Sequence, residues 1–308
     1  MKNWNRTLGV ACMAVMMLIV SACGSTNSDS DNGKIKVTAT TGMIADAVKN
    51  VGGEHVEVTG LMGPGVDPHL YKASQGDIRK LDQADIIFYN GIYLEGKMGD
   101  ILVKMASDKP VIAIAENVGD SQLLETVDGA YDPHIWFDVQ LWMTAVESVR
   151  DGLIKQDPEH KEDYEAQATA YLKKLEDLDQ YVTEQISTIP EDQLVMVTAH
   201  DAFTYFGEAY GMEVVGLQGI STASEYGLKD VQKIVDLLVD REIKAVFIES
   251  SVPKRSIEAV VEGAKAKGHE VTIGGELFSD AMGEEGTEEG TYLGMVRHNV
   301  DTLVEALK

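Results

Sequence analysis

Four side chains that can bind a metal ion stand at widely separated places in the chain, each beside a predicted strand end or a stiff turn. His69 and His134 each end an Asp-Pro-His triplet, His200 directly follows an apolar run, and Asp280 precedes an acidic, glycine-containing loop. Three imidazoles and one carboxylate form a set that accepts Mn²⁺, Zn²⁺ and related ions. Metal binding is therefore the first chemistry that the sequence suggests.

The two Asp-Pro-His triplets present their histidines from stiff turns. Proline fixes its own φ and confines the preceding aspartate to extended conformations. Asp67 and Asp132 could each accept the second ring N–H of the histidine that follows, which would fix its tautomer and orient the ring. A single triplet is weak support because Asp-Pro is common turn chemistry. Two copies at equivalent strand ends favour a shared role.

The other two residues also lie where chemistry is expected. His200 stands at a predicted strand-to-helix junction, which favours a ligand or catalytic group over a core histidine. Asp280 alone has an equally good structural interpretation, since aspartate commonly caps helices and turns. In open α/β sheets, ligands bind beyond the carboxyl ends of the strands. All four residues are predicted to lie at such ends.

Strands and helices alternate along residues 34–156 and again along residues 191–308. Apolar, β-branched runs such as 35–40 are separated by amphipathic helical patterns, including a helix predicted at 94–106, and the last predicted strand covers 270–273. This alternation predicts parallel β-α-β units with helices covering the sheets. We therefore predict an α/β fold with two lobes.

A long amphipathic pattern at residues 157–190 separates the two lobes. Asp157 is a suitable N-cap with Pro158 at the first helical position, and Pro190 predicts the end. A helix of roughly 30 residues is about 45 Å long, which exceeds what one small domain needs. We predict one rigid backbone helix that joins the lobes and permits only small movements between them. A long surface helix is the alternative.

Residues 1–22 have the features of a secretory signal. Basic residues precede the apolar run 8–20, which is too short to span a bilayer comfortably, and small residues stand before Cys23. This arrangement resembles the bacterial lipobox, in which cleavage leaves the cysteine as a lipid-modified N-terminus. An ordinary signal with an incidental cysteine is the alternative. The polar stretch 23–33 is predicted to be a flexible tether.

Composition limits the possible partners. The chain has 51 acidic and 26 basic residues and a formal net charge of -25, which argues against nucleic acid or anionic lipid as a surface partner. A hydrophobic fraction of 44% is ordinary for a globular protein. Cys12 lies in the predicted signal, so Cys23 would be the only cysteine of the mature chain. No intrachain disulfide is then possible.

Five segments together resemble the metal-binding lipoproteins of bacterial ABC transporters, the solute-binding proteins that deliver manganese or zinc to a membrane permease. They occur in order around the central helix and are Cys23 in its lipobox, 63–69, 132–134, 198–203 and 279–283. The resemblance covers essentially the whole mature chain. It implies a monomeric binding protein, not an enzyme, anchored by lipid on the extracytoplasmic face of the cell membrane.

The same resemblance implies a buried metal in the cleft between two α/β lobes. By motif match, the metal ligands would be His69, His134, His200 and Asp280, with Asp67 and Asp132 as possible partners behind them. The expected partners are a divalent metal ion and a membrane permease of the ABC transporter.

The identity of the metal is a separate question. Zinc binds nitrogen and oxygen ligands more tightly than manganese does, so affinity alone does not name it. Many manganese members of the family carry glutamate where His200 stands. Zinc members often carry a His-rich loop, and segment 116–131 contains no histidine. The missing loop, and the likeness of 63–76 and 198–227 to manganese-uptake members, lead us to predict Mn²⁺ as the transported ligand, with Zn²⁺ as the alternative.

Two other classes of function stay open. A secreted metallohydrolase could also hold catalytic zinc with three histidines and an acid, and Glu249 would then be our candidate general base. No His-Glu-x-x-His helix, Gly-x-Ser-x-Gly elbow or Walker loop occurs in the sequence. A surface adhesin with incidental metal is the other class, and it has no sequence feature of its own.

Overall fold

The computed structural model describes residues 33–126 and 129–308. The predicted signal at 1–22, the predicted lipidation site Cys23 and residues 24–32 of the predicted tether lie outside the described residues. Residues Ile35–Lys308 form one compact unit. Among the described residues, every helix is too short or too polar to span a bilayer.

A four-stranded parallel sheet forms the first half of this unit. Its order is β2-β1-β3-β4, and its strands are β1 (Ile35–Ala39), β2 (Val56–Gly60), β3 (Ile86–Tyr89) and β4 (Val111–Ala113). The connecting helices are α2 (Gly42–Gly52), α3 (Gln75–Gln83) and α4 (Gly99–Met105). Parallel strands joined through helices are the β-α-β units that the alternating pattern predicts, so the predicted fold class is confirmed in this half.

The helix predicted at 94–106 begins only at Gly99. The preceding turn is held differently, because the buried carboxylate of Glu95 accepts the backbone N–H groups of Asn90 and Gly91 and the hydroxyl of Thr40. A side chain bound to the turn before it fixes that turn in a non-helical conformation. The turn therefore occupies the first part of the predicted helix.

Two pairs of parallel strands form the second half. They are β5 (Val195–His200) with β6 (Glu213–Gln218), and β7 (Ala245–Glu249) with β8 (Thr272–Leu277). Strands β5 and β7 contact each other, and the helices are α7 (Thr204–Tyr210), α8 (Leu228–Asp240), α9 (Arg255–Ala266) and α10 (Tyr292–Leu307). This half also has the predicted α/β order.

Strand β8 is longer than the predicted strand 270–273 and is displaced toward Asp280. Two glycines, Gly274 and Gly275, hide the strand in the sequence because glycine is depleted in strands. A Cβ atom at Gly274 would lie 2.6 Å from the Ala306 side chain and 2.8 Å from Phe247. Glycine therefore allows helix α10 to pack closely on this strand.

The long helix α6 covers Lys161–Ile186, within the predicted segment 157–190. Residues Pro158–His160 form a separate 3₁₀ turn, since the Asp157 carboxylate contacts His160 and Tyr164 side chains instead of capping backbone N–H groups. Its 26 residues make α6 about 39 Å long. The predicted long backbone helix is confirmed, with a later start and an earlier end.

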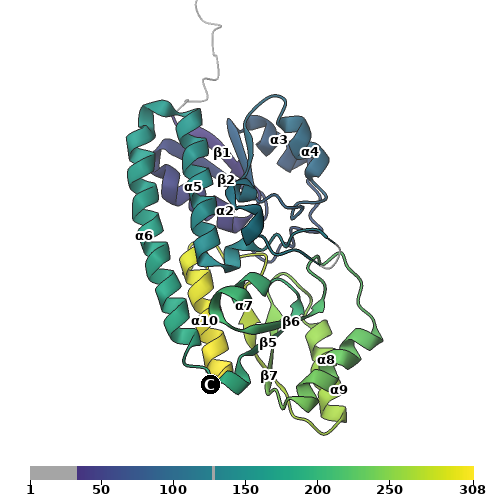
Figure 1. The fold of residues 1–308 in the computed structure, drawn as a ribbon. Coiled ribbons are helices and arrows are strands. Elements are labelled where there is room, and N and C mark those ends of the chain that lie inside the picture. Colours follow the sequence, from purple (N-terminus) through teal and green to yellow (C-terminus); the bar gives the residue numbers. More distant parts are fainter. Residues whose placement is uncertain (1–32, 127–128) are drawn as a thin grey trace, which may run out of the picture. The chain divides into compact units, whose positions relative to one another are not determined.

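Helix α6 does not stand alone. It packs against α5 (Val139–Gln156), α2 and α10, and Figure 1 shows α5 along the upper part of α6 and α10 along its lower part. The buried face of α6 consists of Tyr164, Ala168, Tyr171, Leu175, Leu178, Val182 and Ile186. These residues belong to one apolar core that includes Phe88 of the first sheet and Phe247 of the second half. The two halves are therefore joined through a shared core.

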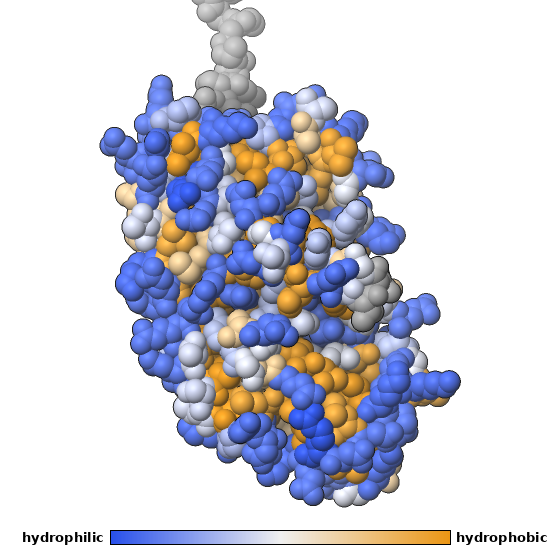
Figure 2. All heavy atoms as spheres, in the orientation of Figure 1, coloured by the Kyte–Doolittle hydropathy of each residue, from blue (hydrophilic) through white to orange (hydrophobic). Residues whose placement is uncertain are grey.

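Separate apolar clusters lie on the other faces of the sheets. One is formed by β5 and β7 with α8 and α9, and another by β3 with α3 and α4. Helices thus cover both faces, as parallel sheets require. Figure 2 shows hydrophilic side chains over α6 and along the outer edges of the visible face, with apolar residues gathered over the strands of the second half.

Candidate metal site

His69 reaches the site from the loop that follows β2. Glycine at position 65 has φ +68°, and the Val66 N–H donates to the Gly63 carbonyl, which turns the chain sharply before the Asp-Pro-His triplet. The Asp67 carboxylate then accepts the backbone N–H of His69 at 2.9 Å and the hydroxyl of Thr222 at 2.6 Å. Asp67 therefore holds the backbone of the triplet, where the sequence suggests a hydrogen bond to the imidazole ring.

His134 is held in a similar turn, with one additional contact. The Asp132 carboxylate accepts the backbone N–H of His134 at 2.9 Å and also lies 2.7 Å from its ring Nδ1. Side chains from elsewhere hold the backbone of the triplet, since Tyr205 donates to the Asp132 carbonyl and Asn90 to the Pro133 carbonyl. The ring contact with Asp132 leaves Nε2 as the nitrogen that faces the site.

His200 is the last residue of β5, as the pattern predicts. Glu249, the last residue of β7, accepts the His200 backbone N–H at 2.8 Å and lies 2.5 Å from its ring Nδ1. This pairing was not predicted. The sequence indicates the pairing only by placing a carboxylate, Glu249, at the end of a second strand. That position identifies Glu249 as the partner of His200 once β5 and β7 are known to be neighbours. Glu249 therefore holds the backbone and orients the ring of His200, as Asp132 does for His134.

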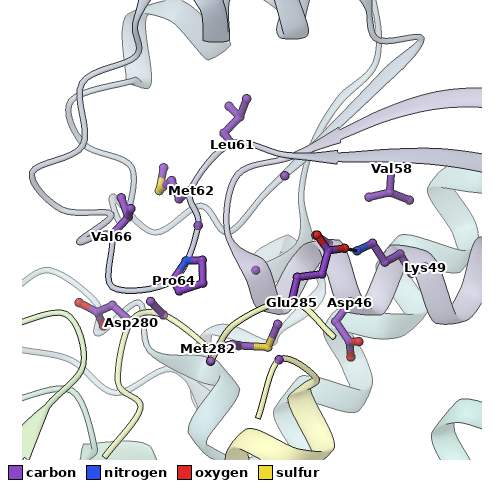
Figure 3. A pocket seen from close by; sticks show the side chains of 17 residues that line it. Asp46, Lys49, Val58, Leu61, Met62, Pro64, Val66, Asp280, Met282 and Glu285 are labelled. Atoms are coloured by element: carbon purple, nitrogen blue, oxygen red, sulfur yellow. Dashed lines mark hydrogen bonds and ion pairs between the residues drawn. The ribbon is translucent and has the colours of Figure 1, made fainter. Parts of the chain in front are cut away.

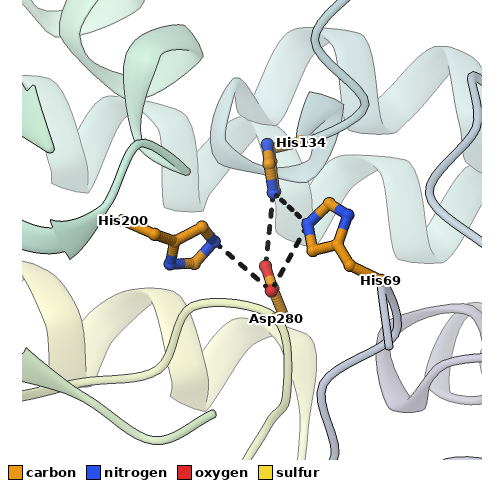
Figure 4. A group of neighbouring side chains, drawn as sticks. All are labelled: His69, His134, His200 and Asp280. Carbon is orange, nitrogen blue, oxygen red and sulfur yellow. Dashed lines mark hydrogen bonds and ion pairs between the residues drawn. The ribbon is translucent and has the colours of Figure 1, made fainter. Parts of the chain in front are cut away.

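The four candidate side chains converge (Figure 4). One donor atom from each of His69, His134, His200 and Asp280 can be chosen so that all lie within 4.8 Å of one another. His69 Nε2 lies 3.2 Å from His134 Nε2 and 3.7 Å from Asp280 Oδ2. The Asp280 carboxylate also lies 3.4 Å from His134 Nε2 and 3.3 Å from His200 Nε2. The four residues come from four different loops or strand ends of both halves.

These donors are buried and incompletely paired. His134 and His200 are fully buried, Asp280 is 2% exposed and His69 is 5% exposed. His200 Nε2 and both carboxylate oxygens of Asp280 have no hydrogen-bond partner within the described part of the chain, despite their short mutual distances. Burying such groups without partners is costly, and this cost is offset where the groups bind a metal ion.

The neighbouring charges shift the pKa values of the four groups in different directions. Burial alone would lower the pKa of His134 and His200. Asp132 and Asp280 outweigh it and raise the pKa of His134 to about 9, and Glu249 and Asp280 raise that of His200 well above its usual value. Burial lowers the pKa of His69 to about 3. Burial would raise the pKa of Asp280, but His200 and His134 hold it well below its usual range.

The remaining histidines lie outside this cluster. His55 pairs with Asp163 and stacks on His160, with ring centroids 3.9 Å apart. His269 and His298 contact the backbone carbonyls of residues 243 and 276. None of these four histidines belongs to the candidate metal site. They are therefore suitable control positions for substitutions of the proposed ligands.

Two cavities reach the candidate site from the surface. One of about 440 Å³ is lined by His69 and Asp132 and by residues of both halves, including Tyr131 and Ser221. Another of about 300 Å³ reaches Asp280 and is shown in Figure 3, where Pro64 and Val66 lie beside the aspartate. Solvent can therefore approach the cluster next to His69 and next to Asp280, whereas His134 and His200 line neither cavity.

Comparison with known proteins adds family relationships to this geometry. Residues 37–306 match the family described as zinc-uptake complex component A, periplasmic. The manganese-binding lipoprotein MntA of Bacillus subtilis is 52% identical over 301 residues, which cover 97% of this chain and 98% of that protein. The zinc-binding protein TroA of Treponema pallidum is 48% identical over 300 residues, or 96% of this chain and 97% of that protein.

A solved structure supports the same relationship. The periplasmic zinc-binding protein TroA from Treponema pallidum superposes with a TM-score of 0.88 at 50% sequence identity, covering 89% of this chain and 99% of that one. The fold predicted from the sequence is therefore one that a related metal-binding protein adopts.

Proposed function

Since this chain belongs to the family of zinc-uptake complex component A, periplasmic, we propose that it is the extracytoplasmic metal-binding component of an ABC importer, which captures Mn²⁺ between its two lobes and delivers it to a membrane permease. The family consists of binding components for uptake, not of enzymes. Within this proposal the domains keep the boundaries expected from the sequence, 34–156, 157–190 and 191–308.

The ligands in this proposal are His69, His134, His200 and Asp280. The observation that supports them most directly is the spacing of their donor atoms. In a tetrahedral site with bonds of about 2.1 Å, neighbouring donors are about 3.4 Å apart. His69 Nε2 lies 3.2 Å from His134 Nε2, and the Asp280 carboxylate lies 3.3, 3.4 and 3.7 Å from His200, His134 and His69, with Oδ1 facing His134 and Oδ2 facing the other two. Such spacing supports a single small ion in contact with all four residues.

The carboxylates behind the histidines prepare them for a metal ion. Asp132 and Glu249 each occupy the Nδ1 side of a ring, so that Nε2 of His134 and His200 faces the cluster. This arrangement fixes the tautomer that coordinates metal and makes the nitrogen more basic. Together with Asp280, the site holds three buried carboxylates. Their negative charge favours a divalent cation over a neutral ligand.

Manganese is our proposed cargo, and zinc is the alternative within the same family. The Bacillus subtilis relative is named manganese-binding, and the His-rich loop that we expect of zinc members is missing at 116–131. The tetrahedral spacing and the order of metal affinities both suit zinc. Binding zinc tightly in vitro would therefore leave the manganese assignment intact, because metal supply in the cell also decides the cargo.

The metal assignment is tested by elemental analysis of the protein isolated from its own cell envelope, with a competition between Mn²⁺ and Zn²⁺ on the purified chain. We expect one ion per chain, mainly manganese in the isolated protein, and a lower Kd for Zn²⁺ than for Mn²⁺ in vitro. Zinc in the isolated protein at ordinary growth concentrations of both metals would replace the manganese assignment with the zinc alternative.

We also propose lipid anchoring at Cys23 on the extracytoplasmic face of the membrane. Support comes from the lipobox-like sequence and from relatives that are named lipoproteins. A single acyl chain binds membranes only marginally, whereas the two or more chains of a bacterial lipoprotein anchor stably. The anchor would keep the binding protein close to its permease.

The hydrolase alternative loses its candidate base. Glu249 is 3% exposed, and both of its carboxylate oxygens are engaged with His200. A general base must reach a water or substrate proton. The contacts of Glu249 instead suit a residue that orients a metal ligand.

Metal affinity is expected to fall steeply with acid. The raised pKa values keep protons on His134 and His200 at pH 7 in the metal-free protein, and both rings must lose them to bind metal. His69 is already neutral there, because its pKa is about 3. About two protons should leave per ion, so Kd should rise up to about a hundredfold for each pH unit lost.

Isothermal titration in buffers of different ionisation enthalpy, at several pH values from 6 to 8, measures this proton release. The sequence alone places the transition near pH 6.5, the usual pKa of histidine. The paired carboxylates move it upward, so competition with protons is expected already at neutral pH. A Kd that stays constant across this range would contradict both expectations.

A further inference from the structure

One buried side chain touches the segments of two proposed ligands. Trp136 lies two residues after His134 in a short 3₁₀ turn, Ile135–Phe137, and is 1% exposed. Its ring packs edge-on against the His134 imidazole, with centroids 5.1 Å apart. Its indole Nε1–H donates to the Ser279 carbonyl at 3.1 Å. Ser279 directly precedes Asp280.

The same turn is held from its other side. The Tyr292 hydroxyl, at the start of α10, donates to the Trp136 carbonyl at 2.7 Å. Tyr292 is fully buried, and its own backbone N–H donates to the buried carboxylate of Asp46. The position of Trp136 is therefore fixed by both its backbone and its indole ring, each through a residue of the second half.

The Asp280 loop has further supports that continue to His200. The hydroxyls of Ser279 and Ser251 lie 2.9 Å apart, and the Ser250 hydroxyl donates to the Ala281 carbonyl at 3.2 Å. Ser250 and Ser251 directly follow Glu249, the partner of His200. Hydrogen bonds thus connect the Asp280 loop to Trp136, which follows His134, and to the serines that follow Glu249, the partner of His200.

We propose that Trp136 is a positioning residue of the metal site, which sets the distance between His134 and Asp280 through its hydrogen bond to the Ser279 carbonyl. This inference rests on the proposed function and deepens it. Groups that orient metal ligands typically contribute a factor of ten to a hundred in metal affinity. The Trp136 indole N–H does not contact a ligand side chain. It holds the Ser279 carbonyl, in the backbone directly before Asp280.

The test compares Trp136→Phe with Trp142→Phe in the full chain in detergent. Phenylalanine keeps an aromatic ring but lacks the N–H donor. Trp142 is equally buried and lies on α5, where its ring stacks on Tyr292 and not on a proposed ligand. The measurements are the Kd for Mn²⁺, the visible absorption spectrum of bound Co²⁺, which reports donor geometry, and the melting temperature without metal.

Trp136→Phe is expected to raise the Kd for Mn²⁺ about tenfold or more and to change the Co²⁺ spectrum. Trp142→Phe should change the spectrum much less than Trp136→Phe does, even if it lowers the melting temperature, because its ring touches Tyr292 and not a proposed ligand. Tyr292→Phe removes only the hydroxyl that holds the Trp136 carbonyl, and we expect a smaller change in the same direction. It also provides a second variant if Trp136→Phe does not fold.

Two results would overturn the inference. One is a wild-type Kd and Co²⁺ spectrum in both Trp136→Phe and Tyr292→Phe. The other is an equal spectral change in Trp142→Phe, which would indicate a general packing effect. Failure of the unmodified protein to bind Mn²⁺, Zn²⁺ or Co²⁺ is a different result, since it would overturn the proposed function itself.

Discussion

Replacing Asp280 with alanine is expected to weaken binding of Mn²⁺ by about a hundredfold or more. Four-ligand structural zinc sites contribute about 10–16 kcal/mol, so one ligand accounts for roughly 3 kcal/mol, or about a hundredfold in Kd. Asp280 is also the only proposed ligand with a negative charge, and its oxygens lie near all three histidines. Its loss should therefore have the largest effect of the four.

Alanine at His69, His134 or His200 should also weaken loading severely. The matched controls are alanine at His55, His160, His269 and His298, which lie outside the cluster and should leave Kd unchanged. Equilibrium competition with a chelator of known affinity measures each Kd. Full loading of Asp280→Ala at the wild-type affinity would remove the aspartate from the proposed ligand set. A loss in the control variants would show that the effect is not specific to the site.

Metal loading is expected to raise the melting temperature by about 10 °C. An ion that binds only the folded state stabilises it by about 4 kcal/mol when its concentration is a thousand times Kd. Each kcal/mol shifts the melting temperature of a chain of this size by about 2–4 °C. The ion would also neutralise a buried cluster whose oxygens have no hydrogen-bond partner in the described residues.

Differential scanning calorimetry with and without Mn²⁺ measures this shift. A chelator should reverse it, and Mg²⁺ serves as a control of equal charge, because Mg²⁺ prefers oxygen ligands and binds poorly to three imidazoles. An equal rise with Mg²⁺ would indicate a general effect of charge on this acidic protein. An absent rise with every transition metal would count against a site between the lobes.

The parts of the site that depend on local chemistry could be predicted from the sequence. The two Asp-Pro-His triplets predict stiff turns without further information, because proline restricts its own φ and the conformation of the residue before it. The place of His200 at the end of a strand follows from the apolar run before it. These features involve residues that are close together in the chain.

The parts that depend on neighbours distant in the sequence could not be predicted. Glu249 lies 49 residues from its partner His200, and only the contact between β5 and β7 makes the pair apparent. Thr222, which binds Asp67, is 155 residues away from it. Equally, the extent of β8 is concealed by two glycines whose role is to accommodate α10. Pairings of this kind depend on tertiary packing, which overrides local preference.

The core shared through α6 has a consequence for transport. One buried core contains side chains of both lobes and of α6. The lobes therefore cannot move far apart without exposing these apolar side chains to water. The empty and the loaded protein should then present nearly the same outline to a permease. A permease would then have to distinguish metal-loaded from metal-free protein by the local order of the residues around the cleft. The metal-free protein would compete with the loaded protein for the same binding surface on the permease.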